Sequence, residues 1–396
     1  MGGPSAGKRP VKIGIAAGLT GRRSGVGIDS RDAVLLAIEE INQAGGILGH
    51  PVEPVIEDTV DQEAGMMTSV FLKLIERESV DGIIAHWGNN GCAEFDIAQE
   101  KKVPYISAGA VNQAEAVITP NPDAYSYVFL ALPSYSLYGT VFPEYIAKLE
   151  KEGKYEPINH NIAMISRSLE YSIFITEGQK KTFTDMGWNI TIDEFLPSAE
   201  IEDWSPVLSK IRSDPPALII STMTDPASDH LLLKQFLEDP TPSLLYEQAS
   251  PNDPEFREMS GNDADGVMHV YGVKKVPTDD PYRVKYKEHF DRDPSPYGII
   301  SYDQMYLMKA AMESAGDPFD REKVANALLN VDHRGIMGRY KMDPATHLPL
   351  SGGEYIPFPC YQMWNTENMM LYPEEIAERE FGYPHWYQSA LAKYGK

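Results

Sequence analysis

The chain has 396 residues, of which 42% are hydrophobic, so it can bury a sizeable core and form two or three domains. Its 58 acidic and 35 basic residues give a formal net charge of -23, which repels nucleic-acid phosphates and anionic lipid. No apolar run approaches the roughly 18 to 20 residues that cross a bilayer. We therefore expect a globular protein that neither binds nucleic acid nor spans a membrane.

The first residues, MGGPSAGKRP, lack the apolar centre of a signal peptide. Either the protein is cytoplasmic, or an export signal was removed and a new start was added. GPSAG, at 3–7, fits the G-x-S-x-G pattern of a serine nucleophile, but no strand precedes it to form the strained turn that exposes such a serine. We expect residues 1–9 to be a disordered leader.

The chain contains two cysteines, Cys92 and Cys360. Two are too few for a disulfide framework, and neither has neighbouring residues at the spacing of metal ligands. We expect no metal site and no cofactor, and the sequence leaves open whether the two cysteines bond to each other.

The first third of the chain alternates expected strands and helices. The apolar segment VKIGIAAGL predicts a strand, and apolar residues recur at helical spacing over 29–43, where Asp29 or Ser30 is the expected cap. The next expected elements are a strand at 51–58, a helix at 64–77, a strand at 80–87, a helix at 92–101 and a strand at 103–109.

A second alternating series follows. Its expected members are helix 140–149, strand 161–166, helix 176–186, strand 189–196, helix 206–212, strand 217–222, helix 228–237 and strand 243–247. The chain continues through GVMHVYGV, a helix near 281–290 and the long helix SYDQMYLMKAAMESAG. A tail rich in Pro, Tyr and Trp, from about residue 367, is expected to pack along a lobe surface.

Strands that alternate with helices form parallel sheets, because each crossover helix must bury its apolar stripe on the sheet. The fold class predicted is therefore α/β, with two doubly wound parallel-sheet lobes. The βα elements of the last third are expected to return and complete the first lobe.

The segment TGRRSGVG, at 20–27, directly follows the first expected strand. It fits the pattern T-G-x-x-x-G-x-G with which short-chain dehydrogenases enclose a nucleotide pyrophosphate. Asn89, Asn90 and Gly91 resemble a second signature of those enzymes. An NAD(P)-dependent enzyme is therefore one hypothesis.

In that hypothesis Arg22 and Arg23 face the phosphates, and Asp58 holds a ribose hydroxyl. The catalytic pair of those enzymes, a tyrosine with a lysine four residues on, occurs here only as Tyr271 and Lys275, far beyond the first lobe. Two further hypotheses compete with the enzyme: the glycines form a tight strand-to-helix turn, or the loop is one wall of a cleft for a smaller solute.

Five segments carry a resemblance to a known family: VKIGIAAGLTG, AIEEINQAGGILGHPVEPVIEDT, YISAGA, DPEFREMSGNDADGVMHV and SYDQMYLMKAAMESAG. Over nearly the whole chain they resemble the type I periplasmic binding proteins of the leucine, isoleucine and valine class. AIEEINQAGGILG is the most specific, because few other α/β proteins share its order of helix, glycine turn and strand.

The resemblance implies two lobes joined by a hinge that the chain crosses three times, near 130–133, 269–272 and 335–340. The lobes it implies are 10–131 plus 272–338, and 132–271 plus 339–396. Such a protein closes on its ligand and so presents a shape that a membrane permease recognises.

By the same resemblance, the ligand carboxylate meets hydroxyls and backbone amides of two first-lobe loops, HWGNNGC and SAGAVN. Asn89 stands where a serine is usual, and Val111 where a threonine is usual, so two hydroxyl donors are replaced. The arginines of 20–27 are candidates for the anion contact that these two positions no longer make in full. The first-lobe candidates are Arg22, Arg23, Trp87, Asn89, Asn90, Gly109, Ala110 and Val111.

In the second lobe, Glu247 falls where the family uses an acid to hold the ligand's ammonium. A buried carboxylate needs a cation or several donors, which argues for an amine or another donor group on the ligand. Tyr171 matches an aromatic wall residue, while Trp87 and Tyr246 either add aromatic walls or belong to the core. The second-lobe candidates are Tyr171, Thr224, Asp225, Tyr246 and Glu247.

The function implied is that of a non-catalytic, periplasmic or otherwise extracytoplasmic receptor of an ABC importer. Its solute is expected to be an amino acid, first of all a branched-chain one, or a related amide, urea-like compound or aromatic acid. The expected partners are this solute and the ABC permease, with the protein itself a monomer. A cytoplasmic ligand sensor with the same fold stays open, as does the NAD(P)-dependent enzyme.

Overall fold

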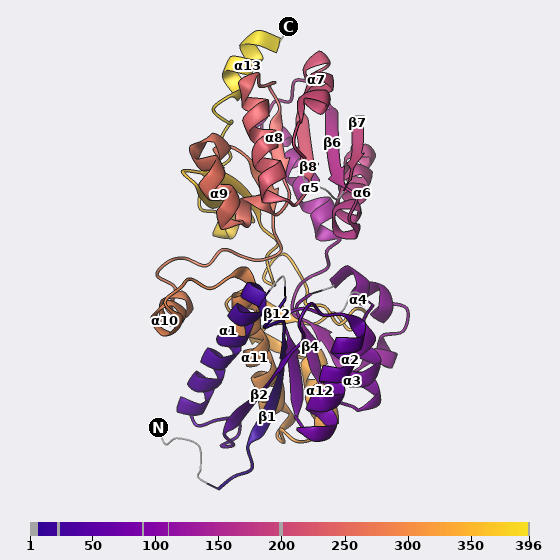
Figure 1. Cartoon of the computed structure of the whole chain (residues 1–396), viewed down its shortest axis with the longest axis vertical. Coiled ribbons are helices and arrows are strands. Elements are labelled where there is room, and N and C mark those ends of the chain that lie inside the picture. The colour runs from indigo at the N-terminus through magenta and orange to yellow at the C-terminus, as the bar shows by residue number, and fades with distance from the viewer. Residues whose placement is uncertain (1–6, 22–23, 89–90, 110, 198–200, 395–396) are drawn as a thin grey trace. The chain divides into compact units, whose positions relative to one another are not determined.

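A computed structural model describes residues 7–21, 24–88, 91–109, 111–197 and 201–394. The chain divides into two units, each with its own sheet and helices (Figure 1). Unit 1 is Met1–Ser134 with Val273–Pro357, and unit 2 is Tyr135–Gly272 with Phe358–Lys396. The predicted α/β class with parallel-sheet lobes is confirmed.

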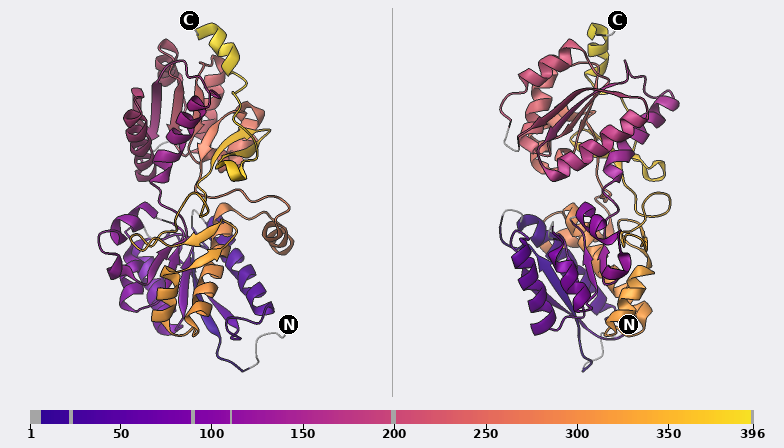
Figure 2. Two further views of the ribbon diagram at one scale, coloured as in Figure 1. Left: turned by 180° about the vertical axis from the view of Figure 1, so that it is seen from behind. Right: turned by 90° about the vertical axis from the view of Figure 1, so that its right-hand side faces the viewer.

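Unit 1 is built on five parallel strands in the order β2-β1-β3-β4-β5. The strands are β1 (Val11–Ala17), β2 (Val52–Asp58), β3 (Gly82–Ala85), β4 (Tyr105–Ser107) and β5 (Val128–Leu130). Every residue of β3, β4 and β5 is buried, as expected for a parallel sheet with helices on both faces (Figure 2).

The helices of unit 1 come from two separate stretches of the chain. The first supplies α1 (Ser24–Gln43), α2 (Ala64–Leu72) with a π-helical turn at Lys73–Arg77, α3 (Ala93–Glu100), α4 (Val111–Ile118) and the 3₁₀ turn Pro122–Tyr125. The second supplies α10 (Pro281–Phe290), α11 (Pro296–Ala315), α12 (Arg321–Leu329) and the hairpin of β11 (Asp332–Arg334) and β12 (Arg339–Lys341). The expected return of the last third to the first lobe is what α11 and α12 do.

Unit 2 is built on seven strands in the order β14-β13-β10-β9-β8-β6-β7. The strands are β6 (Asn161–Arg167), β7 (Asn189–Leu196), β8 (Leu218–Thr222), β9 (Leu244–Glu247), β10 (Met268–Val270), β13 (Cys360–Trp364) and β14 (Glu367–Tyr372). β6 to β10 pair in parallel, whereas β13 and β14 pair antiparallel.

The helices of unit 2 lie mostly between its strands in sequence. They are α5 (Leu137–Lys151), α6 (Glu170–Asp185), α7 (Ser205–Ser213), α8 (Pro226–Glu238), α9 (Pro254–Ser260) and α13 (Tyr387–Tyr394), with 3₁₀ turns at Ser250–Asn252, Gly261–Ala264 and Glu374–Ile376. Among the described residues, no helix of either unit is both long and apolar enough to cross a membrane.

The first part of the tail does not lie along a surface as expected. Its strand β14 pairs with β13, which precedes the tail and itself pairs with β10, so both strands extend the sheet of unit 2. Farther on, Trp386 is 2% exposed and its Nε1 donates to the carbonyl oxygen of Ser243 at 3.1 Å. Trp386 and Tyr387 thus belong to the core of unit 2, whereas Phe381 and Tyr383 are half-buried.

The start of α1 also differs from the prediction. The helix begins at Ser24, so Asp29 and Ser30 lie inside it and neither caps it. The Asp29 carboxylate instead accepts hydrogen bonds from Arg292 Nε at 2.9 Å, Tyr286 Oη at 2.9 Å and Ser295 N at 2.8 Å. A contact with a distant segment has replaced the local cap.

The predicted lobe bounds stay a prediction, and the division by contacts differs from them at the third crossing. It places 339–357 with unit 1 instead of with the second lobe. Leu130 N donates to the carbonyl oxygen of His347 at 3.0 Å, and His347 Nδ1 lies 3.0 Å from the carbonyl oxygen of Val128. These bonds hold the segment along β5.

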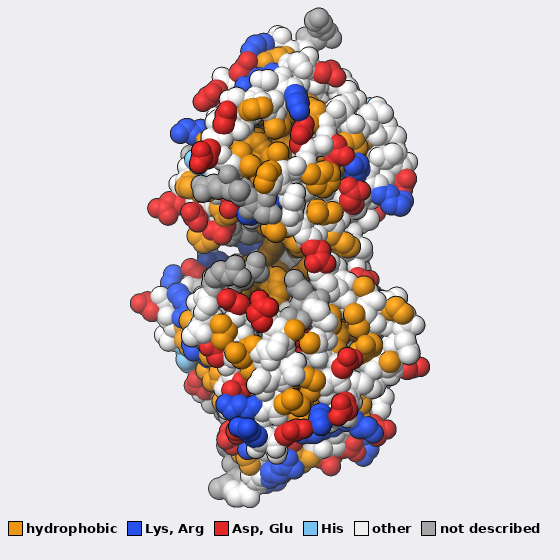
Figure 3. Space-filling view, turned by 45° about the vertical axis from the view of Figure 1, so that its right-hand side comes forward, with side chains coloured by type: hydrophobic (Ala, Val, Ile, Leu, Met, Phe, Trp, Pro, Cys, Tyr) orange, Lys and Arg blue, Asp and Glu red, His pale blue; other side chains and the backbone are white. Residues whose placement is uncertain are grey.

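The described part of the predicted leader makes contacts with unit 1: Arg9 forms an ion pair with Asp81 at 2.8 Å. Cys92 and Cys360 are buried free thiols in different units, so the structure contains no bond between them. On the face shown in Figure 3, acidic and basic side chains intermingle on both units, so the negative charge is not gathered in one area there.

Candidate binding site

In an open parallel sheet, ligands meet the loops that follow the carboxyl ends of the strands. In unit 1 those loops follow β1, β3 and β4, and in unit 2 they follow β6, β8, β9 and β10. The eight predicted contact residues that the structure describes lie in such loops or in the elements directly beside them. Arg22, Arg23, Asn89, Asn90 and Ala110 lie outside the described residues.

Gly27, the last residue of TGRRSGVG, and Gly18, two residues before that segment, form a tight contact. A Cβ on Gly27 would lie 2.0 Å from the carbonyl oxygen of Gly18, and a Cβ on Gly18 would lie 2.6 Å from the carbonyl oxygen of Val60. No side chain fits at these distances, so α1 can begin directly against the end of β1 only with glycine at both positions.

Asp58 accepts hydrogen bonds from residues of the same loop. Its Oδ1 accepts from Leu19 N and from Val60 N, each at 2.8 Å, and its Oδ2 accepts from Thr20 Oγ1 at 2.6 Å. Burial raises the pKa of Asp58, but these hydrogen bonds outweigh it and the pKa lies below its ordinary value. Gly18, Gly27 and Asp58 thus all serve to close this loop.

Two aromatic rings lie together beyond the strands of unit 1. The half-buried Trp87 follows β3, and its ring centroid is 5.4 Å from that of Tyr297 at the start of α11. A Cβ on Gly109 would lie 2.7 Å from Trp87 Cδ2, so Gly109 lets the indole approach the β4 loop. Val111 is fully buried at the start of α4, and its side chain packs in the core of unit 1.

Glu247 is the last residue of β9 and is fully buried. Neither of its carboxylate oxygens has a hydrogen-bond partner within the described part of the chain. Burial, together with the nearby charge of Asp229, raises the pKa of Glu247 well above its ordinary value. A carboxyl group in this state is costly unless a donor or a cation meets it.

Asp229, in the first turns of α8, is a second fully buried acid near Glu247. Its Oδ1 accepts from Ser221 Oγ at 2.7 Å and its Oδ2 from Ser250 Oγ at 2.5 Å. Burial raises the pKa of Asp229 to about 6 although both hydroxyls lower it. Ser221 and Glu247 are partners in the β8–β9 register, so their side chains lie side by side on one face.

On the other face of β9, tyrosines surround an amide. Gln248 Nε2 donates to Tyr171 Oη at 3.1 Å, and Tyr246 Oη donates to Gln248 Oε1. Tyr171 is half-buried, and its ring centroid lies 6.1 Å from that of Tyr135. Tyr246 is fully buried, and its ring centroid lies 4.5 Å from that of Phe142. Tyr246 therefore lies in the core of unit 2.

Thr224 and Asp225 form the turn between β8 and α8. Thr224 adopts a left-handed backbone conformation with φ of 57°, and Asp225 Oδ2 accepts from Ser228 N at 3.0 Å. This is a helix N-cap, which gives Asp225 a structural task.

Three residues of these clusters, namely Gln248, Asp229 and Tyr297, were not predicted from the sequence. Gln248 follows Glu247 directly and could have been included with its loop. Asp229 and Tyr297 carry no such signal, since an acid or a tyrosine near a helix start usually faces solvent. Their places depend on how the helix packs on the sheet.

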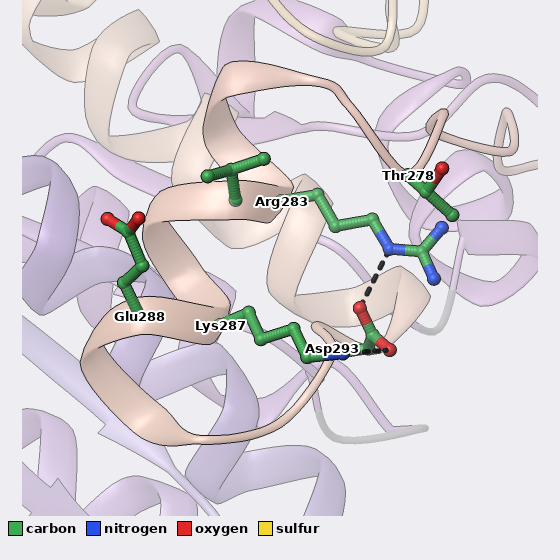
Figure 4. Close-up of a pocket in the computed structure, with 6 residues that line it drawn as sticks. Thr278, Arg283, Lys287, Glu288 and Asp293 are labelled. Atoms are coloured by element: carbon green, nitrogen blue, oxygen red, sulfur yellow. Dashed lines mark hydrogen bonds and ion pairs between the residues drawn. The ribbon is translucent and has the colours of Figure 1, made fainter.

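A separate surface pocket of about 350 Å³ lies along α10 in unit 1 (Figure 4). It is lined by Thr278, Arg283, Val284, Lys287, Glu288 and Asp293. Both basic side chains of the pocket form ion pairs with Asp293. Arg283 Nε lies 2.8 Å from its Oδ1, and Lys287 Nζ lies 3.8 Å from its Oδ2. None of the predicted contact residues that the structure describes lines it. Across the described ranges, no group of three or more His, Cys, Asp or Glu side chains is placed to hold a metal ion.

The chain matches a family model described as periplasmic binding protein over residues 10–352. The leucine-, isoleucine-, valine-, threonine- and alanine-binding protein of Pseudomonas aeruginosa is 24% identical to it over 324 residues, which cover 80% of this chain and 82% of that protein. The match thus spans both units.

Solved structures extend the likeness. A crystal structure assigned to a branched-chain amino acid ABC transporter from Silicibacter pomeroyi has a TM-score of 0.91 at 28% identity, covering 96% of this chain and 100% of that one. The branched-chain amino acid transporter substrate binding protein of Streptococcus pneumoniae, solved with isoleucine, shares the fold, with a TM-score of 0.69 at 19% identity over 91% and 98% of the two chains. The chain therefore belongs to the type I periplasmic solute-binding proteins of the leucine, isoleucine and valine class.

Proposed function

We propose that this protein is the substrate-binding subunit of an ABC importer, which binds a small solute outside the cytoplasm and delivers it to the permease. Family membership over residues 10–352 supports a solute receptor and not an enzyme. The Pseudomonas aeruginosa relative and the Streptococcus pneumoniae structure are described as branched-chain amino acid binding or transport proteins. In this proposal the protein works as a monomer with two partners, the solute and the permease.

The solute we propose is an amino acid, first of all a branched-chain one, whose ammonium group binds to Glu247. The observation that carries this choice is the fully buried Glu247 carboxyl, whose oxygens have no hydrogen-bond partner among the described residues. An ammonium group brings three donors and a positive charge, which offset the cost of burying an ionised acid. A neutral amide or an aromatic acid offers less to such a group.

In each unit, further side chains near the strand ends are proposed to contact the solute. In unit 2, Tyr171 and Gln248 form a polar pair beside β9. In unit 1, Trp87 and Tyr297 offer apolar surface, which suits an aliphatic or aromatic side chain. Arg22, Arg23 and the Asn89–Asn90 loop, which lie outside the described residues, are proposed for the solute carboxylate.

The test is a calorimetric and thermal-shift panel on protein freed of retained solute by mild unfolding and refolding. The panel contains leucine, isoleucine, valine, threonine, alanine, an aliphatic amide, urea, benzoate and NADH. We expect at least one amino acid to bind and to raise the melting temperature, because a ligand that binds only the folded state stabilises it.

The variant Glu247→Gln should weaken binding of that amino acid by about 2 to 3 kcal/mol, because a charge-assisted hydrogen bond is replaced by a neutral one. Glu255→Gln, at an exposed position of α9, is the matched control and should bind as the parent does. Equal binding by both variants would remove Glu247 from the site. Stabilisation by NADH alone would favour the enzyme hypothesis instead.

A further inference from the structure

The two buried acids at the end of β9 differ in how their charge is compensated. Asp229 receives hydroxyl donors from Ser221 and Ser250, whereas Glu247 receives no donor from any residue that the structure describes. Because Ser221 is the register partner of Glu247, the hydroxyl that fixes Asp229 stands directly beside Glu247. The two carboxyl groups therefore share one buried region.

The neighbouring strand supplies no positive charge either. Met268 pairs with Tyr246, so the next residues, His269 and Glu247, follow side by side on one face. His269 is fully buried, and burial lowers its pKa to about 3, so its imidazole is neutral at physiological pH. The imidazole of His269 stacks on the ring of Tyr361, with 5.0 Å between the ring centroids, and its Nδ1 lies 3.3 Å from Asn252 Nδ2.

Among the elements around this pair, α8 is capped by Asp225 and carries the titratable or charged residues Asp229, His230, Lys234 and Glu238. α9 carries Glu255, Arg257 and Glu258, and β10 carries His269. Asp225 adds negative charge near Asp229, while the charge of Arg257 acts on His269. In the described part of the chain, no ion pair joins a cation to Glu247 or Asp229. Two buried acids without a cation cannot both be ionised at low cost, because like charges in a medium of low polarity repel strongly.

We propose that Asp229 is a positioning residue of the binding site: burial and the charge of Asp229 together make Glu247 hold a proton in the solute-free protein, and Glu247 exchanges that proton for the cationic group of the solute. The inference rests on the proposed function, since the solute must bring a cation. On binding, the O–H bond of Glu247 breaks, its proton passes to the buffer, and the carboxylate accepts N–H donors from the solute's ammonium.

Two consequences follow. Binding releases up to one proton, so affinity rises with pH by up to about tenfold per unit while the Glu247 of the free protein is protonated. A neutral solute of the same shape gains nothing from this exchange. The pair therefore selects a cationic solute over a neutral amide, and it weakens binding in acid.

The first experiment needs no ligand. Infrared spectra of the refolded, solute-free protein, recorded at a series of pH values from 5 to 8, should contain the carbonyl band of a protonated carboxyl group that persists at pH 7. The band should be missing in Glu247→Gln and should titrate at lower pH in Asp229→Asn, because the repelling charge is gone. Asp185→Asn, at the exposed end of α6, should leave it unchanged.

A structural role alone would not move this titration. If Asp229→Asn does not fold, Ser250→Ala serves instead: without the 2.5 Å donor, Asp229 ionises less readily and the Glu247 band should again titrate at lower pH. If the parent has no protonated carboxyl that Glu247→Gln removes, the inference is overturned.

The second experiment is calorimetry with L-leucine in buffers of different ionisation enthalpy. We expect the parent to release close to one proton per leucine near pH 6.5 and Asp229→Asn to release distinctly less. Leucine binding without proton release would overturn the inference and leave the proposed function standing. A protonated Glu247 in a protein that binds none of the amino acids would support the role of Asp229 while overturning the proposed solute.

Discussion

At the scale of single residues, two buried acidic side chains have opposite surroundings. The contrast distinguishes an acid with a structural role from a candidate for ligand binding. Asp303 on α11 is fully buried and accepts from Ile336 N at 2.8 Å, Met337 N at 2.9 Å and Tyr340 Oη at 3.2 Å. Glu247 is buried to the same degree without any such donor among the described residues. The first acid holds a turn in place, and the second is a candidate for ligand contact.

The titration of Asp303 gives a prediction for unit 1. Burial raises its pKa to about 6, although the bonds from Met337, Ile336 and Tyr340 lower it. Because the folded-state pKa lies above the unfolded value, the protonated form adds stability that is complete below about pH 4 and is lost as pH rises through about 6. We expect the free energy of unfolding of the parent to fall by about 2 kcal/mol more than that of Asp303→Asn between pH 4 and 7.

Urea unfolding at a series of pH values measures this difference. Asp317→Asn, on the exposed loop before α12, is the control and should keep the full dependence on pH. A parallel pH dependence in the parent and Asp303→Asn would show that Asp303 does not titrate in this range.

At the scale of elements, the contact between β1 and α1 depends on glycine. Gly27 is buried against Gly18, and a Cβ there would lie 2.0 Å from a backbone oxygen that cannot move aside. Gly25, two residues earlier in the same helix, has open space around its Cβ position. The two glycines offer a matched pair for one substitution.

Gly27→Ala is expected to destabilise unit 1 by about 2 kcal/mol or more, because overpacking forces the backbone of α1 away from β1. Gly25→Ala should leave stability unchanged or raise it by up to about 1 kcal/mol, since alanine is the better helix former. Urea unfolding followed by circular dichroism measures both. Equal effects would mean that α1 does not begin against β1 as described.

At the scale of the whole molecule, each unit is assembled from separate stretches of the chain. In unit 1, Gln304 on α11 donates from Nε2 to the carbonyl oxygens of Ala85 and Ile106, each at 3.0 Å. A helix from the last third thus covers β3 and β4, which come from the first. The first stretch alone leaves one face of its sheet without this cover.

A fragment of residues 1–134 should therefore fail to fold, whereas 1–134 joined by a flexible linker to 273–357 should unfold cooperatively. The reason is the apolar surface that α11 and α12 bury on the sheet. Circular dichroism and thermal melts of the two fragments test this. A cooperative melt of 1–134 alone would contradict it.

Much of the fold follows from local pattern. The alternation of apolar strands with helices of period 3.6 predicts two parallel-sheet lobes, and the return of the last third to the first lobe, because each helix must cover a sheet. The position of Glu247 at a strand end follows from the same pattern.

The sequence by itself determined the class of fold, the family and the strand-end loops that hold the candidate contacts. Only the tertiary structure decided that β13 and β14 extend the sheet of unit 2, that Asp29 binds Arg292 instead of capping α1, and that Asp229 lies near Glu247. The physical reason is the distance along the sequence over which each feature is set. Hydrophobic periodicity and turn formation depend on residues that are close in the sequence. Strand pairing, burial and the repulsion between two acids depend on residues that are distant in the sequence and are brought together by packing.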